Sequence, residues 1–166
     1  MAAIKQFIDL LNSHQHQPRK VTPETAIQYL SARKFDIPKA VALYEANLLT
    51  RQREGLFGID SRIDPLKTEL ETGKFTVLPS RDVSGAAIAL FTASVHNPHN
   101  VTHKTTLQGV VYQLDVALQQ PDTQKNGLVF IYDMSGSKYS NFDYELSQKI
   151  LTMLKTVTSR KPEGQR

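Results

Sequence analysis

The first half of the chain carries apolar residues at helical spacing. Near its start, every third or fourth position is apolar, at Ile4, Phe7, Ile8 and Leu11. Thr22-Pro23-Glu24 is typical of a helix start, because threonine caps the first turn and proline suits its first position. Asp36 predicts the cap of the next helix, and Asp64-Pro65 predicts the start of a further short one. We therefore expect a helical bundle over residues 1–73.

The pattern changes to that of β-strands at Lys74. The runs 75–78 and 86–94 are β-prone and flank the turn-rich stretch 80–85, which predicts a β-hairpin. A helix is expected next. Its apolar face would consist of Leu107, Val110, Val111, Leu114, Ala117 and Leu118.

The segment Leu128–Tyr132 is apolar at every position, which is typical of a strand buried on both faces. A last helix is expected over residues 142–157. The order of helical bundle, β-hairpin, helix, buried strand and helix predicts the α/β class. A strand buried on both faces needs neighbouring strands and covering helices, and only two other strands are predicted. The last helix should also lead to another parallel strand. We therefore expect residues 74–157 to form an incomplete α/β lobe.

Composition narrows the classes of function. The 166 residues are 40% apolar, which is ordinary for a globular protein. Their net charge of +4 is too small to indicate a basic surface that binds nucleic acid. The chain has no cysteine, which excludes disulfides and thiol nucleophiles. The pattern predicts no signal peptide and no membrane span, so we expect a cytoplasmic location. Residues 158–166 are expected to form a disordered basic tail.

Several stretches resemble the CRAL-TRIO family. Residues 26–36 (AIQYLSARKFD), followed by Lys39-Ala40, are similar to the signature of the family's N-terminal helices. Residues 127–136 (GLVFIYDMSG) resemble its central strand and the exit from that strand. Residues 73–78 together with 88–93, and residues 126–134, narrow the resemblance to the CRAL-TRIO regions of vesicle-associated non-receptor protein-tyrosine phosphatases.

The resemblance implies a fold and a function. Members of the family have a helical N-terminal part and a lobe that holds one lipid in an apolar pocket above a mixed sheet. For this chain, it implies a lipid-binding module of the phosphoinositide type that targets a protein to membranes. Its partners would be a phospholipid or another hydrophobic ligand and an anionic membrane surface, and its place would be peripheral on intracellular membranes. The alternative is a protein-interaction fragment, or a truncated product without independent activity.

Phosphatase chemistry is excluded for this chain on chemical grounds. That reaction needs a cysteine thiolate as the nucleophile, and no cysteine is present. The sequence also has no Gly-x-Ser-x-Gly elbow and no phosphate-binding glycine loop. We therefore expect a protein that is not an enzyme, with no catalytic residues and no cofactor.

The apolar helix face and the β-prone runs supply candidates for an acyl-chain pocket. Such faces are more often ordinary core, and it is the resemblance that favours contact with a lipid. The candidates are Phe91, Leu107, Val111, Leu114, Phe130 and Tyr132. Because side chains alternate along a strand, Phe130 and Tyr132 share one face and Ile131 points to the other.

Four basic residues are candidates for contact with a lipid headgroup or a membrane. They are Arg33, Lys34, Arg51 and Arg53. Each basic side chain near an anionic surface contributes about 1 kcal/mol. The alternative for all four is an ordinary solvated helix face.

Two further features could bind a metal ion or a ligand. His96, His99 and His103 surround Pro98 in a polar stretch without a nearby carboxylate, so we expect exposed loop histidines and no metal site. Asp133 follows the predicted buried strand, where it would either contact a ligand or accept hydrogen bonds from backbone donors of the next loop. We favour the structural role for Asp133.

Overall fold

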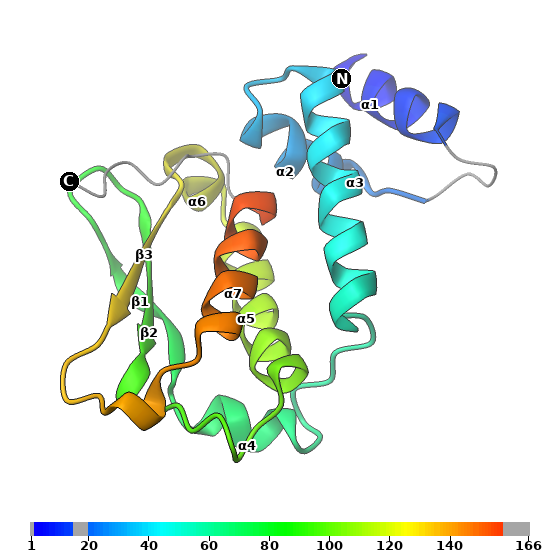
Figure 1. The fold of residues 1–166 in the computed structure, drawn as a ribbon. Helices are drawn as coiled ribbons and strands as arrows, with labels where there is room; N and C mark the ends of the chain where they lie inside the picture. The colour runs from blue at the N-terminus through cyan, green and yellow to red at the C-terminus, as the bar shows by residue number, and fades with distance from the viewer. Residues whose placement is uncertain (1, 15–19, 158–166) are drawn as a thin grey trace.

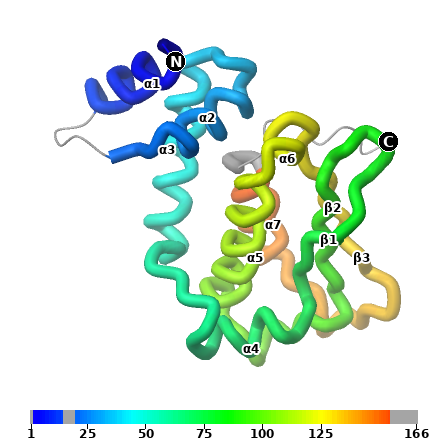
Figure 2. Tube along the Cα trace, turned by 180° about the vertical axis from the view of Figure 1, so that it is seen from behind, coloured from blue at the N-terminus to red at the C-terminus, as the bar shows by residue number. Residues whose placement is uncertain are grey.

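The structure is a computed structural model that describes residues 2–14 and 20–157 (Figure 1). The predicted basic tail, residues 158–166, lies outside the described residues. Seen from behind, the first three helices lie on one side of the molecule and the sheet on the other, with two long helices between them (Figure 2).

The first three helices form a core of their own. They are α1 (Ala2–Ser13), α2 (Pro23–Ala32) and α3 (Ile37–Glu54). The two predicted caps are confirmed, because Thr22 Oγ1 accepts from the Thr25 amide at 3.2 Å and Asp36 Oδ1 from the Lys39 amide at 3.1 Å. The buried residues of this bundle core are Phe7, Leu11, Ala26, Tyr29, Leu30, Ala40, Val41 and Leu43.

The core of the α/β lobe begins before the sheet. Helix α3 ends at Gly55, which has a left-handed φ of 70°, and the next residue, Leu56, is buried in the second core. Helix α4 (Leu66–Glu71) packs against α5 (His103–Leu118), where Leu66 and Leu70 lie beside Gly109. The helices before residue 73 are thus divided between two cores.

The sheet has three strands in the order β1-β2-β3. The predicted hairpin is confirmed: β1 (Phe75–Arg81) and β2 (Ala87–Thr92) are antiparallel. Strand β3 (Leu128–Asp133) runs parallel to β2, with Ala87 opposite Leu128 and Thr92 opposite Asp133. This mixed sheet, joined by helices, confirms the predicted α/β class.

Helices α5 and α7 (Tyr144–Val157) cover one face of the sheet (Figure 1). Both follow a strand, and α5 belongs to the crossover that joins β2 to its parallel neighbour β3. The buried side chains between helices and sheet are Leu56, Phe75, Ala89, Phe91, Leu107, Val110, Val111, Leu114, Leu118, Leu146, Ile150, Met153 and Leu154.

The opposite face of the sheet is open in the part of the chain that the structure describes. We call it the open sheet face and define it by its four apolar residues, Ile88, Leu90, Val129 and Ile131. The prediction that β3 is buried on both faces is therefore wrong for these residues, because Val129 is 39% and Ile131 43% exposed. The apolar run reflects one packed face and one uncovered face.

Two helix boundaries differ from the prediction. A separate short helix, α6 (Pro121–Asn126), follows α5, where the sequence suggested only a helix end. Helix α7 begins two residues later than expected, because Asp143 Oδ1 accepts the Leu146 amide hydrogen at 3.1 Å and so caps the helix. Phe142, which was expected inside the helix, is 48% exposed.

Neighbouring residues of β3 should respond differently to a polar substitution. We expect Phe130→Gln to lower the free energy of unfolding by about 2 kcal/mol or more, because Phe130 packs against the lobe core. Ile131→Gln should change it by about 0.5 kcal/mol, because Ile131 faces outward. Urea unfolding followed by circular dichroism measures both. Equal losses would contradict the assignment of the two faces.

Candidate functional site

The six predicted lipid-pocket residues lie together in the lobe core. Phe91, Leu107, Val111 and Leu114 are buried, and Phe130 and Tyr132 pack against them from β3. The Phe91 and Tyr132 rings are stacked with their centroids 5.1 Å apart. In this arrangement they occupy the space between helices and sheet.

The core placement follows from the alternation of side chains along the strands. The candidates on β2 and β3 all point toward α5 and α7, whereas a ligand on the open sheet face would meet the alternate residues. None of the six lines either of the two surface pockets described below. Lipid contact by these six side chains stays a prediction.

The open sheet face presents four large apolar side chains in two facing pairs. Ile88 lies opposite Val129 and Leu90 opposite Ile131, on the central strand and its parallel neighbour. Such a surface gains about 25 cal/mol for each Å² of apolar area removed from water. The arrangement suits an apolar partner and offers no side chain for covalent chemistry.

The four basic candidates do not form one patch. Arg51 Nη2 donates to Asp115 Oδ1 at 2.7 Å, and this pair joins α3 to α5. Burial alone would lower the pKa of Arg51, but the hydrogen bond and negative charge of Asp115 outweigh it and raise that pKa. Arg53 pairs with Glu54 at 3.3 Å.

The other two candidates lie at the opposite end of α3. Arg33 and Lys34 belong to the turn between α2 and α3, where Lys34 has a left-handed φ of 52° and is exposed. The intervening helix places them about 20 Å from Arg51, at 1.5 Å per residue. A membrane contact would therefore involve one end of α3 or the other.

A polar cleft of about 700 Å³ separates the bundle from the lobe. Tyr29 and Arg51 line it from the bundle side, and Asp115, Gln119 and Gln124 line it from the lobe side. Because most of its lining side chains are polar, this cleft does not suit an acyl chain.

A polar network at the start of α7 was missed by the sequence reasoning. The expectation of exposed loop histidines is wrong for His96, which is 1% exposed, and for His103, which is half-buried at the start of α5. The ring Nε2 atoms of His96 and His103 lie 3.2 Å and 3.0 Å from Asp143 Oδ2. His99 stays exposed. Asp143 lies 40 or more residues further along the chain than these two histidines, so no local pattern reveals their contact.

The network has a defined protonation pattern. An ionised Asp143 only accepts hydrogen bonds, so His96 Nε2 carries the proton and His96 Nδ1, which is buried, has no partner in the described residues. Burial lowers the pKa of His96 despite the opposing effect of Asp143. Burial would raise the pKa of Asp143, but the Leu146 amide and the two histidines lower it. Both shifts favour neutral His96 beside a charged Asp143.

The network continues to the end of α3. Lys149 Nζ lies 3.3 Å from His103 Nδ1 and 3.4 Å from Glu54 Oε2. Within residues 2–14 and 20–157, no three potential ligands are arranged to hold a metal ion. The arrangement instead ties the ends of α3, α5 and α7 together.

Asp133 has the structural role that was favoured for it. Its carboxylate accepts from the backbone amide of Ser135 at 2.9 Å and also from the Ser135 hydroxyl. These bonds lower the pKa of Asp133 and hold the turn that leaves β3. That prediction is confirmed.

Known proteins show clear similarity to this chain. A model of the CRAL/TRIO domain family matches residues 71–162. The mouse protein named tyrosine-protein phosphatase non-receptor type 9 is 44% identical over 155 residues, which are 92% of this chain and 26% of the phosphatase. The human protein of that name is 43% identical over the same length. This chain therefore spans about a quarter of the length of these relatives.

A second kind of relative is more distant. A human protein named alpha-tocopherol transfer protein-like is 28% identical over 131 residues, covering 77% of this chain and 38% of that protein. Among the helices that the structure describes, none has the length and apolar character needed to span a membrane.

Acid should destabilise the protein through His96. Between the usual histidine pKa of 6.5 and the lower pKa of His96 in the fold, the unfolded chain binds a proton that the folded chain does not. We expect the free energy of unfolding to fall as pH drops below 6.5, by up to about 1.4 kcal/mol per pH unit. Urea unfolding at a series of pH values measures this slope.

Two variants separate His96 from other titrating groups. His96→Gln keeps a nitrogen donor for Asp143 but cannot titrate, so its slope below pH 6.5 should be smaller than that of the parent. His99→Gln changes an exposed histidine three residues away and should keep the parent's slope. An unchanged slope in His96→Gln would contradict this account.

Proposed function

Because the chain belongs to the CRAL/TRIO domain family, we propose that it binds a lipid and helps to place a protein on phosphoinositide-bearing membranes. The acyl part of the lipid would lie on the open sheet face. Binding would come from apolar burial and would involve no covalent step. The module would act from the cytoplasm, at the surface of intracellular membranes.

The observation that carries this proposal is the uncovered apolar face of the sheet. Two paired strands present Ile88, Leu90, Val129 and Ile131 on it, and no described helix covers them. Large exposed apolar surfaces on proteins mark binding sites for partners, ligands or membranes. An acyl chain fits such a surface, because it has no polar groups to satisfy.

The relatives support an apolar ligand and a role without catalysis. The name of one relative refers to transfer of tocopherol. The phosphatase relatives extend well beyond the part that this chain matches, and the chain lacks the cysteine that phosphatase chemistry needs. We therefore propose a ligand-binding role for this chain.

For attraction to anionic membranes, we propose Arg33 and Lys34. Neither forms an ion pair with a carboxylate among the described residues, whereas Arg51 and Arg53 pair with Asp115 and Glu54. A charge that is already paired contributes less to an anionic surface. Arg33 and Lys34 are also adjacent in one turn, where Lys34 is exposed and Arg33 half-buried.

Removing the apolar surface should remove lipid binding. We expect the double variant Leu90→Gln with Ile131→Gln to bind phosphatidylcholine vesicles at least about tenfold more weakly, as measured by cosedimentation. The reason is that two large apolar side chains are lost from the contact. Val83→Gln is the control, since Val83 is fully exposed on the hairpin turn, away from the open sheet face. Equal binding by the parent and the double variant, or none by the parent, would contradict the proposal.

Phosphoinositide attraction is tested separately. We expect vesicles that contain a phosphatidylinositol phosphate to bind the parent more tightly than phosphatidylcholine alone. Arg33→Gln with Lys34→Gln should weaken that binding by about thirtyfold, because each lost charge contributes about 1 kcal/mol. Lys67→Gln with Lys125→Gln removes the same charge from exposed positions elsewhere and should lose less. Equal losses in the two double variants would leave only non-specific charge attraction and reject these two residues as a site.

A further inference from the structure

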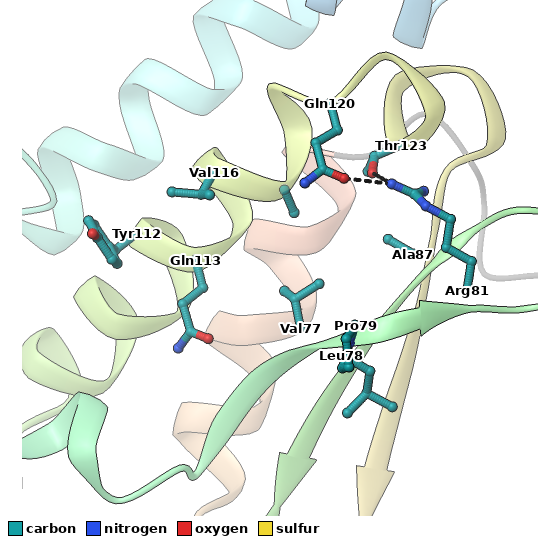
Figure 3. Close-up of a pocket in the computed structure, with 11 residues that line it drawn as sticks. Val77, Leu78, Pro79, Arg81, Ala87, Tyr112, Gln113, Val116, Gln120 and Thr123 are labelled. Atoms are coloured by element: carbon teal, nitrogen blue, oxygen red, sulfur yellow. Dashed lines mark hydrogen bonds between the residues drawn. The ribbon is translucent and has the colours of Figure 1, made fainter.

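A groove of about 400 Å³ lies between the edge strand β1 and helix α5 (Figure 3). It is on the helix-covered side of the sheet, away from the open sheet face. Val77 and Pro79 line it from β1, and Tyr112 and Val116 line it from α5. Its volume lies at the lower end of the roughly 300–1,000 Å³ that is usual for small-molecule pockets.

The groove exists because β1 departs from its partner strand. Pairing with β2 is regular from Phe75 to Val77 and resumes only at Arg81, with a register shift between them. Pro79 lies in this irregular stretch and has no amide hydrogen to donate. Across the groove, Tyr112 and Val116 are 37% and 49% exposed. Apolar side chains therefore line the groove from both elements, and those of α5 remain accessible.

Arg81 closes one end of the groove. Its guanidinium donates to Gln120 Oε1 at 2.7 Å and to Thr123 Oγ1 at 3.1 Å (Figure 3). It also donates to Gly85 O at 3.1 Å. All three acceptors are neutral. Within residues 2–14 and 20–157, no carboxylate pairs with Arg81.

Three other arginines of the chain are neutralised by carboxylates. Arg51, Arg53 and Arg62 pair with carboxylates at 2.7, 3.3 and 3.0 Å. A partly buried cation that lacks a counter-ion gains from an anion that reaches it, and the planar guanidinium matches carboxylate and phosphate oxygens. The charge of Arg81 at one end and the apolar walls along the groove are complementary to a molecule with an anionic head and an apolar body.

We propose that this groove is a second ligand site, which binds a small amphipathic anion. The carboxylate or phosphate head lies at Arg81, and the apolar body lies between Val77 and the exposed side of α5. This site is independent of lipid binding on the open sheet face, because the two lie on opposite sides of the sheet.

The test uses decanoate, decyl phosphate and uncharged decanol as probes for the isotope-labelled chain, with binding followed by amide chemical shifts. We expect either or both of the anions to shift the amides of residues 77–81 and 112–120 and to bind more tightly than decanol. Which anion binds better identifies the head group. Shifts confined to residues 88–90 and 129–131, or equal binding of decanol, would overturn the proposal.

Variants locate the head group. Arg81→Gln should weaken binding of the anions by about tenfold or more and leave binding of decanol unchanged. Val116→Glu places a negative charge in the groove without removing the hydrogen bonds of Arg81, so it keeps the test valid if Arg81→Gln fails to fold. Leu49→Glu is the matched control, because Leu49 is a 62% exposed helix residue outside the groove.

The expected pattern is loss of anion binding in Arg81→Gln and Val116→Glu but not in Leu49→Glu. The double variant Leu90→Gln with Ile131→Gln should keep anion binding, which separates this site from the proposed lipid surface. Loss of decanoate binding in that double variant, with full binding in Val116→Glu, would overturn the proposal.

Discussion

The one-sided covering of the sheet is the constraint on which the other features depend. Strands β2 and β3 are parallel, so the connection through α5 must cross over, and α7 returns along the same face. Alternation of side chains then assigns every second residue to a packed core and the rest to an open surface. Phe91 and Leu90 are neighbours in the chain, yet one lies in the core and the other on the open sheet face.

Much of the fold could be predicted from local signals. Capping and hydrophobic periodicity depend on residues that are close together in the sequence. They therefore predicted the caps at Thr22 and Asp36, the hairpin and the apolar face of α5. The face assignment could not be predicted, because an apolar run such as Leu128–Tyr132 does not say which side the helices cover. The predicted lipid-pocket residues therefore fell on the packed side.

Interactions between distant residues could not be predicted from local patterns either. His96 was expected in an exposed loop, but Asp143 lies beside it only after β3 and its following turn have formed. Likewise, the pairing of Arg51 with Asp115 and the neutral partners of Arg81 follow from the packing of helices. Charge counts along the sequence cannot distinguish a neutralised arginine from one that still lacks an anion.

The two separate cores have a consequence for the order of folding. The bundle core joins residues 7 to 43, so its contacts close short loops at little cost in chain entropy. Strand β2 must wait for β3, which is about forty residues further along the chain. During synthesis, the N-terminal helices can fold while the β-hairpin still lacks its parallel neighbour β3. The hairpin is then the segment that most needs protection from other nascent chains.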